Sequence, residues 1–402
     1  MELNKMYLTK KIRLLPTAEQ EKLFWKSAGA ARWSYNFFLG YNEKKYNEWL
    51  EDNNKERFIN ESDARKYINN VLKSTTHTWL KEVGSNVIKM SVMDANTALN
   101  RFFNKISGYP KYKSRKKSKP SFYVNYETLK RTQNGFRGEK IGVIKTREPL
   151  PRIPKDQKYV NPRITYDGKF WYLSVGYKVE QKQVKLTDEK IGIDLGLKDL
   201  AIVSNTDNSY SKKYRNINKG HKIKLLEKRL KRAQRKLSRK ILNNIESYDE
   251  NRKPKYIRPL EDCKNIQKQI HIVQNLYRKL TNIRNNYIHQ VTTEIVKTKP
   301  SKIVLEDLNV SGMMKNKHLS KAIADSKWYE FKRQILYKAE LYGIEVVLAD
   351  QFYPSSKTCS YCGSYKKNLK LNNRTYICDE CGSIIDRDIN AAINLANYQN
   401  LE

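Results

Sequence analysis

The chain has 402 residues, 39% of them hydrophobic and 30% charged, with a formal net charge of +37 at pH 7. This composition can bury a core and excludes a wholly disordered chain, and the length predicts two or three domains. We expect a soluble, cytoplasmic protein, because no apolar run approaches the roughly 18 residues of a transmembrane helix and the start lacks a signal-peptide pattern.

The charge imbalance predicts a polyanionic partner. Lys and Arg number 79 against 42 Asp and Glu. An AT-rich genome explains part of the Lys and Asn content, but in an ordinary soluble protein Glu would rise together with Lys. A chain with this much uncompensated charge repels itself, so we expect nucleic acid as partner. A membrane surface is the second possibility, weakened by the absence of a lipidation motif.

The first third of the sequence predicts a strand followed by a helical lobe. Residues 7–14 alternate in polarity and predict a strand within a segment 1–16. Thr17 followed by Gln20 is a capping-box pattern, so a helix should begin there. Helical spacing of apolar residues then continues through 17–107, with the first helix presenting one face made of Phe24, Ala28, Ala31, Tyr35 and Phe38.

A basic strip interrupts this pattern at 108–120. Six of the nine residues from 111 to 119 are Lys or Arg, interleaved with tyrosines. A charge run is often only a solvated surface, but the flanking prolines and the tyrosines favour an ordered strip along a phosphate backbone. The residues predicted to bind nucleic acid here are Lys111, Lys113, Arg115, Lys116 and Lys117.

The segment 108–185 should complete a small β-barrel, together with the first strand. Strand-like runs flank Asp167-Gly168, a hairpin turn signal. From 186 to 350 the pattern becomes α/β, with strands near 190–196, 200–204, 302–308 and 344–349 and a helix carrying Trp328, Phe331, Ile335 and Ala339.

A long helical hairpin is predicted over 213–298, with a loop at 245–262 between its arms. Apolar residues follow a three-four spacing on both arms. The outer face of the first arm is basic, and Glu227 is the only acid from 221 to 240. Without acids for i,i+4 pairs, this face should attract phosphates. The predicted contacts are Lys228, Arg229, Arg232, Arg235, Lys236 and Arg239.

Four cysteines within 351–385 predict one structural zinc ion. Cys359, Cys362, Cys378 and Cys381 form two Cys-x-x-Cys pairs, whose thiolates can close a tetrahedron around Zn²⁺. Four sulfur ligands leave no position for a substrate, so the ion should stabilise the fold. Cys263 is interpreted as an incidental residue of the hairpin.

Three acids in α/β segments predict a metal-dependent catalytic site. Asp194 lies between two glycines on one face of its strand, Glu306 lies near the end of another, and Asp388 opens the last helix, in segment 386–402. Singly, each has an ordinary structural explanation as a strand end, an ion-pair partner or a helix cap. Together in an apolar sheet they would repel one another. Two Mg²⁺ ions, about 4 Å apart, would relieve this repulsion and support phosphodiester hydrolysis.

Four segments in order carry a resemblance: GIDLGLKDLAIVS, IVLEDLNVSGM, YPSSKTCSYCG and DRDINAAINL. They resemble the split RuvC nuclease core of TnpB proteins from bacterial insertion sequences, which compact type V CRISPR effectors share. YLTKKIRLLPTAEQ, GAARWSYNFFL and GYPKYKSRKKSKPSF are similar to the amino-terminal part of that family. The resemblance implies that Asp194, Glu306 and Asp388 are the three catalytic acids; Asp388 is preferred to Asp386 because it directly precedes the Ile-Asn-Ala-Ala match.

The resemblance also implies the overall fold, an α/β plus α+β multidomain protein. An RNase-H-like (RuvC) core would carry the inserted zinc ribbon and the helical hairpin. The small barrel would be a wedge domain, interrupted by a helical recognition lobe over 17–107.

The implied function is RNA-guided cleavage of double-stranded DNA beside a short flanking motif, with a guide RNA from the protein's own mobile element. The expected form is a monomeric ribonucleoprotein at the nucleoid, with no membrane partner. Three alternatives remain open: a catalytically silent RNA-guided regulator or transposition accessory protein, a strand-transfer transposase, and a guide-independent nuclease of branched DNA. All three acids are present, which argues against the first. The second would need a donor-end recognition domain, and the third would hardly need the amino-terminal half.

Overall fold

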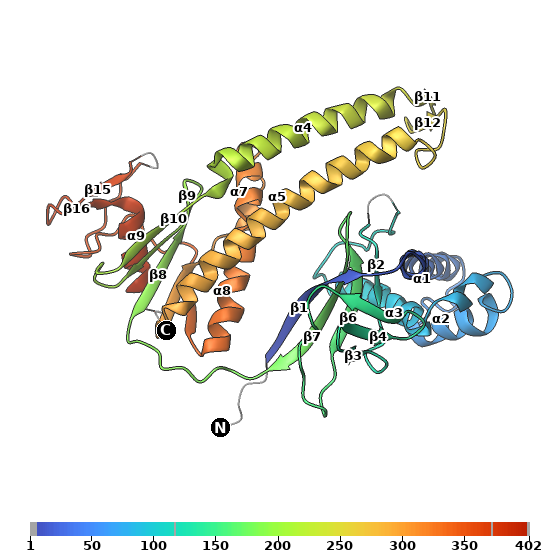
Figure 1. Cartoon of the computed structure of the whole chain (residues 1–402). Helices are drawn as coiled ribbons and strands as arrows, with labels where there is room; N and C mark the ends of the chain where they lie inside the picture. The colour runs from blue at the N-terminus through green and yellow to red at the C-terminus, as the bar shows by residue number, and fades with distance from the viewer. Residues whose placement is uncertain (1–5, 116–117, 371–372, 400–402) are drawn as a thin grey trace. The chain divides into compact units, whose positions relative to one another are not determined.

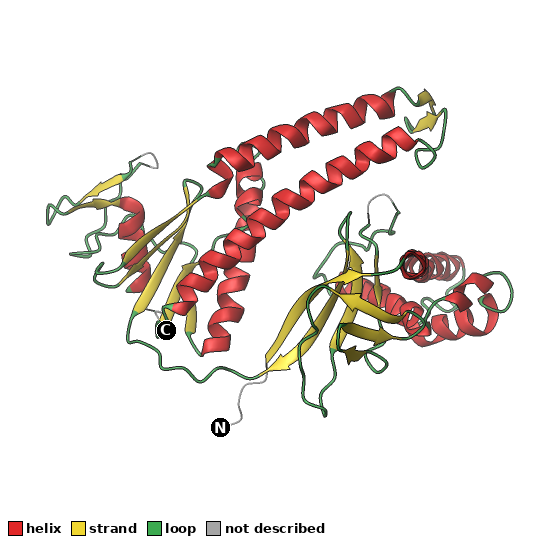
Figure 2. Cartoon of the chain, viewed as in Figure 1, coloured by secondary structure: helices red, strands yellow, loops and turns green. Residues whose placement is uncertain are grey.

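The computed structural model describes residues 6–115, 118–370 and 373–399 (Figure 2). The chain forms two compact units, Lys5–Val179 and Glu180–Glu402, and each has its own hydrophobic core. Lys116 and Lys117 of the predicted basic strip lie outside the described residues. None of the helices in the described ranges combines the length and the hydropathy needed to span a bilayer.

The amino-terminal unit contains a seven-stranded antiparallel sheet with the order β2-β6-β7-β1-β5-β4-β3. The strands are β1 (Met6–Leu15), β2 (Ser121–Tyr123), β3 (Lys130–Thr132), β4 (Gly135–Gly138), β5 (Gly142–Thr146), β6 (Val160–Tyr166) and β7 (Trp171–Val179). β1 pairs with β7 on one side and β5 on the other, which confirms that the first strand joins those after residue 120. In the described residues β2 and β3 are the edge strands, so closure into the expected barrel stays a prediction.

The turn between β6 and β7 forms as its sequence predicts. The carboxylate of Asp167 accepts hydrogen bonds from the backbone N–H of Lys169 and Phe170, at 3.0 and 2.8 Å. Gly168 takes a φ of 95°, a conformation that other residues avoid. The Asp-Gly pair therefore supplies both the side-chain acceptor and the backbone freedom that the hairpin needs.

The helical part of this unit consists of α1 (Ala18–Glu51), α2 (Glu61–Tyr67), the π-helical turn Ile68–Leu72, the 3-10 turn Thr78–Glu82 and α3 (Ser85–Phe103). α1 begins at the predicted capping box, in which Thr17 Oγ1 accepts from Gln20 N at 3.3 Å and Gln20 Oε1 accepts from Thr17 N at 3.1 Å. Its buried face includes all five predicted apolar residues. That face packs against α3 and β2.

The carboxy-terminal unit is built on a five-stranded sheet with the order β10-β9-β8-β13-β14. The strands are β8 (Lys190–Leu195), β9 (Asp199–Asn205), β10 (Ser211–Arg215), β13 (Lys302–Glu306) and β14 (Glu345–Ala349). β10, β9 and β8 are antiparallel, whereas β8, β13 and β14 are parallel. Helices α5 (Lys264–Lys297) and α8 (Trp328–Tyr342) share a core with one face, and α9 (Arg387–Ala396) packs on the other (Figure 1).

The long hairpin consists of α4 (His221–Leu242) and α5, which run side by side from the sheet to a distant tip (Figure 1). Two predictions for it are corrected. The hairpin does not begin at 213, because residues 211–215 form β10, an edge strand in which only Tyr214 is buried. The tip is not a plain loop, because β11 (Ile245–Tyr248) and β12 (Pro254–Tyr256) pair as an antiparallel ribbon.

Gly192 is the point at which α9 lies directly on the sheet. A Cβ atom built on Gly192 would lie 2.0 Å from the carbonyl oxygen of Ala392 and 2.4 Å from the backbone nitrogen of Ala396. Both are backbone atoms and cannot turn aside. The glycine therefore sets how closely the helix carrying Asp388 approaches the strand carrying Asp194.

We expect Gly192→Ala to destabilise the protein by about 3 kcal/mol or more, because overpacking against backbone forces the helix off the sheet. Thermal unfolding of the variant and the wild type measures this. Gly108→Ala is the matched control, since a Cβ there meets nothing within 4 Å. Equal loss of stability in both variants would contradict the role given to Gly192.

Candidate functional site

Asp194 and Glu306 lie at the same edge of the carboxy-terminal sheet. Asp194 is the penultimate residue of β8 and Glu306 the last residue of β13. These strands are parallel neighbours, with Ile193 paired to Leu305, so the next residue of each strand is an acid. The carboxyl ends of parallel strands form the usual ligand-binding edge of such a sheet. The hydroxyl of Ser355 donates a hydrogen bond to Glu306 Oε1 at 2.8 Å.

Asp388 reaches this edge from α9, and Asp386 has a different function. The Asp386 side chain caps α9, accepting hydrogen bonds from the backbone N–H of Asp388 and Ile389 at 3.0 and 3.1 Å. It also pairs with Lys213 Nζ at 2.6 Å. The structural explanation considered for Asp388, that of a helix cap, is therefore wrong. Asp388 is the second residue of the helix and pairs with Arg387 at 2.9 Å and Arg374 at 3.5 Å.

The three acids repel one another. Burial, followed by the charges of Glu306 and Asp388, raises the pKa of Asp194 well above its usual value. Burial and the charge of Asp388 also raise the pKa of Glu306, although the Ser355 hydrogen bond opposes this shift. Mutual repulsion among partly buried carboxylates is the electrostatic condition that a bound divalent cation relieves. Binding of Mg²⁺ by Asp194, Glu306 and Asp388 stays a prediction.

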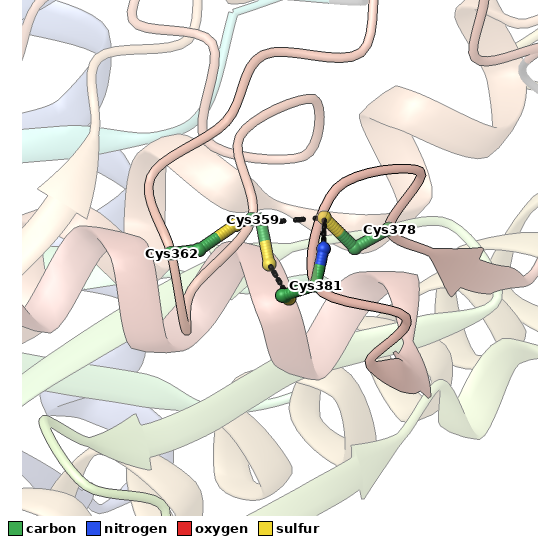
Figure 3. A group of neighbouring side chains, drawn as sticks. All are labelled: Cys359, Cys362, Cys378 and Cys381. Atoms are coloured by element: carbon green, nitrogen blue, oxygen red, sulfur yellow. Dashed lines mark hydrogen bonds between the residues drawn. The ribbon is translucent and has the colours of Figure 1, made fainter.

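The four predicted cysteines lie together and have the spacing of zinc ligands (Figure 3). Their sulfur atoms all lie within 4.8 Å of one another. Cys359 Sγ is 3.7 Å from Cys381 Sγ, and Cys362 Sγ is 3.5 Å from Cys378 Sγ. Ligands about 2.3 Å from a tetrahedral zinc ion lie about 3.8 Å from one another, so the cluster could hold one zinc ion.

The surroundings of Cys359 and Cys378 favour thiolates, the form that binds metal, whereas burial and the neighbouring Cys378 raise the pKa of Cys362 against the effect of the Ser364 hydroxyl. The backbone N–H of Cys381, followed by the hydroxyl of Ser364, lowers the pKa of Cys378 to about 6. The pKa of Cys359 is also lowered, against the effect of burial, by the hydroxyl of Ser383. Ser364 precedes β15 (Thr375–Ile377), whereas Cys381 and Ser383 lie in the loop between β15 and β16 (Ile384–Asp386).

Several polar residues connect the cysteine segment to the three acids, and sequence reasoning missed them. The side chains of Asn390 and Asn394, both on α9, donate to the carbonyl oxygen of Thr358 at 2.6 and 2.7 Å. Asn394 also donates to the carbonyl of Ser355, the residue that bonds Glu306. Asn390 belongs to the DRDINAA segment that carries the resemblance, so its position was a signal that could have been used.

The predicted basic face of α4 is exposed to solvent. All six predicted contacts on α4 are exposed: Lys228, Arg229, Arg232, Arg235, Lys236 and Arg239. Glu227, the only acid of the helix, pairs with Arg284 and Lys321 instead, at 2.9 and 3.0 Å. The cations of this face are therefore available to an anionic partner.

Residues 109–113 of the basic strip contact α1. Tyr109 and Tyr112 both donate hydrogen bonds to Glu43. Lys113 exchanges two backbone hydrogen bonds of 2.8 Å with the Asn36 side chain, and its ammonium lies 3.6 Å from the centre of the Tyr35 ring. Lys111 and Arg115 are exposed, whereas Lys113 is partly buried. The phosphate contacts of the strip stay a prediction.

Three family models match the chain. A model described as a probable transposase matches residues 174–317, a Cas12f1-like TNB domain matches 328–395, and a helix-turn-helix domain matches 6–50. In the structure, residues 6–50 are β1 followed by most of the single helix α1. The first two matches include all three acids and all four cysteines.

Relatives and a solved structure agree with these matches. A protein of Streptomyces pristinaespiralis, named as a candidate RNA-guided DNA endonuclease, is 29% identical over 96% of this chain and 87% of its own length. InsQ of Escherichia coli K12, named likewise, is 28% identical over 96% of this chain and 90% of its own. The Cas12f1 chain in a complex with sgRNA and target DNA superposes with a TM-score of 0.55 at 14% identity, covering 98% of this chain and 99% of that one.

The sheet and its flanking helices share the fold of this Cas12f1 chain, and this agrees with the fold expected for a TnpB-like RuvC nuclease. The chain is therefore similar to the TnpB family over most of its length.

Proposed function

We propose that this protein is an RNA-guided DNA endonuclease that hydrolyses phosphodiester bonds with Mg²⁺. The observation that carries the proposal is that Asp194, Glu306 and Asp388 come together from three separate elements. Burial, followed by the charges of Glu306 and Asp388, raises the pKa of Asp194. The names of the relatives support the guided reaction. A catalytically silent regulator is not favoured, because it would have no need to keep three mutually repelling acids.

In the proposed mechanism, the three acids hold two Mg²⁺ ions. When bound, these ions would activate the attacking water and stabilise the leaving 3′ oxygen. The Ser355 hydroxyl orients Glu306, and Asp386 fixes the start of α9 and therefore the position of Asp388. Arg374 and Arg387 offset the negative charge of Asp388.

The remaining parts of the chain are assigned by the same proposal. The helical lobe (17–107) and the sheet of 108–185 would recognise the guide and the motif that flanks the target. The exposed cations of α4 would hold phosphates, and segment 351–385 would be a zinc ribbon. The active form would be a monomeric ribonucleoprotein at the nucleoid. The net charge of +37 supports a large nucleic-acid partner.

The test is to purify the protein from cells that carry its native flanking DNA and to sequence the RNA that copurifies. We expect one abundant RNA whose end derives from sequence beyond the element. Replacing that end with a chosen sequence should redirect cleavage to the matching duplex, which gel analysis of the DNA measures. Heterogeneous RNA, or cleavage that does not follow the new guide end, would contradict the proposal.

A further inference from the structure

The helical lobe contains a cavity that the proposed mechanism does not use. It has a volume of about 340 Å³ and lies between α1 and the 3-10 turn Thr78–Glu82. Pockets for small organic ligands typically measure roughly 300–1,000 Å³. The lining residues are Lys26, Gly29, Arg32, Trp33, Trp79 and Glu82.

Two tryptophans give the cavity aromatic walls. The rings of Trp33 and Trp79 have centroids 5.9 Å apart and lie nearly perpendicular, at 80°. The Trp33 ring also stacks on Phe37, with centroids 5.2 Å apart. Trp79 remains 40% exposed, so part of its ring is open to solvent. Exposed indole faces are the usual stacking partners of unpaired bases.

The charge of the cavity suits a phosphate. Lys26 and Glu82 form an ion pair at its wall, so the guanidinium of Arg32 supplies the remaining charge of the lining. Burial, followed by the nearby charge of Arg115, lowers the pKa of Arg32. A pair of crowded cations beside an aromatic wall is stabilised by an anion placed between them. The aromatic wall could stack on a base, and the adjacent arginine could bind the phosphate attached to that base.

Gly29 keeps one side of the cavity open, although a glycine inside α1 lowers the stability of the helix. It lies within α1, where glycine is less favourable than alanine. A Cβ atom built on Gly29 meets no heavy atom within 4 Å, so no neighbour in the described residues requires a glycine here. This contrasts with Gly192, where backbone atoms fill the space. The open space above Gly29 is part of the cavity.

We propose that this cavity captures one unpaired nucleotide of a single-stranded nucleic acid, with its base against Trp33 and Trp79 and its phosphate against Arg32. The inference rests on the proposed function and adds a base-dependent contact to it, whereas the basic strip and α4 offer contacts to phosphates alone. The nucleotide belongs either to the guide RNA or to a DNA strand, since the stacking chemistry is the same for both.

Photocrosslinking of the full chain tests the location of the nucleotide. The probes are single strands of about 12 nucleotides, within the site sizes of such surfaces: one RNA with 5-iodouridine and one DNA of the same sequence with 5-iododeoxyuridine. Mass spectrometry of the crosslinked peptides should find the adduct on Trp33 or Trp79. The probe that gives more adduct identifies the source, and adducts only elsewhere on the chain would overturn the proposal.

Affinity measurements test the role of the base. Trp79→Leu should weaken binding of the uridine strand about 5-fold to 100-fold, the loss expected for one stacked base. It should not weaken binding of a strand with abasic sites, which keeps the phosphates. Trp49→Leu is the control, because Trp49 lies on α1, as Trp33 does, but does not line the cavity. Equal affinity of the uridine and abasic strands for the wild type would exclude a base-dependent site.

Filling the cavity separates binding from folding. Gly29→Ala should raise the midpoint of thermal unfolding, and Gly29→Met should reduce both the adduct and the affinity for the uridine strand several-fold without lowering that midpoint. Unchanged binding by Gly29→Met would overturn the inference.

If the wild type cleaves guided DNA but shows no base-dependent binding, only this inference fails. If base-dependent binding is present but no guide RNA copurifies, only the proposed function fails.

Discussion

Asp194→Asn is expected to reduce guided DNA cleavage by more than about 100-fold. Mutation of a residue that only hydrogen-bonds to a metal ligand costs about 10-fold to 100-fold, and loss of the ligand itself should cost more. The amide cannot replace the anionic oxygen that would bind Mg²⁺. The same change should raise the thermal stability of the metal-free protein, because ionised Asp194 is buried beside Glu306 and Asp388. Loss of cleavage together with gain of stability would distinguish a metal ligand from a structural residue.

The stability gain has a defined pH dependence. The folded-state pKa of Asp194 is raised above its ordinary value of 3.8. At pH values below 3.8 the carboxyl is protonated in both states, so wild type and variant should differ little. The destabilisation of the wild type grows as the pH rises from 3.8 toward the folded-state pKa. Thermal unfolding in buffer without Mg²⁺ and without chelator, so that zinc is kept, measures the difference across this range, and a constant difference would contradict the burial argument.

Asp386→Asn and Asp388→Asn provide the matched comparison. Asparagine caps helices as well as aspartate does, and the ion pair with Lys213 is partly exposed and contributes about 0–1 kcal/mol. Asp386→Asn should therefore keep most of the cleavage, whereas Asp388→Asn should lose it as Asp194→Asn does. The opposite order would transfer the catalytic role to Asp386.

Removal of zinc is expected to unfold the cysteine segment while both sheets remain folded. Structural zinc contributes a binding free energy of about 10–16 kcal/mol. The cysteine segment has only two strands of three residues each, whose contacts are too few to keep it folded without this contribution. Cys378→Ser should have the same effect. Because Asn390 and Asn394 hold the start of this segment, and Ser355 bonds Glu306, cleavage should fall by about 10-fold or more.

Native mass spectrometry and hydrogen exchange measure this prediction. The wild type should contain one zinc ion, and chelation should remove exchange protection from β15 and β16 but not from β8 or β13. Cys263→Ser is the control, since Cys263 lies at the start of α5, outside the four-cysteine cluster. Full protection of β15 and β16 in a protein without zinc would contradict the structural role.

Much of the candidate site could be predicted because its signals are local. The two Cys-x-x-Cys pairs bring their sulfur atoms together through short loops, and the capping box of α1 spans only four residues. Gly192 and Asp194 share a strand face by the alternation of side chains. In the structure α9 lies against Gly192 on that face.

Errors occurred in short polar segments, where no apolar pattern marks the local pairing or the helix start. β10 has little apolar pattern and is a strand because it pairs with β9 at the edge of the sheet. The ribbon at the hairpin tip likewise depends on pairing between short polar segments. Asp386 and Asp388 differ by two positions, and only the geometry of the helix start assigns the cap to Asp386.

Residue types and spacings alone therefore predicted a nucleic-acid partner, the four-cysteine cluster, the three acids and most of the helices and strands, since these predictions depend on charge, short-range geometry and periodicity. The folded chain decided the contacts that join residues far apart: the order of the strands, the repulsion among the three acids, the Ser355–Glu306 hydrogen bond and the cavity between Trp33 and Trp79. Local propensity carries no information about which distant surfaces meet, because packing of the whole chain determines them.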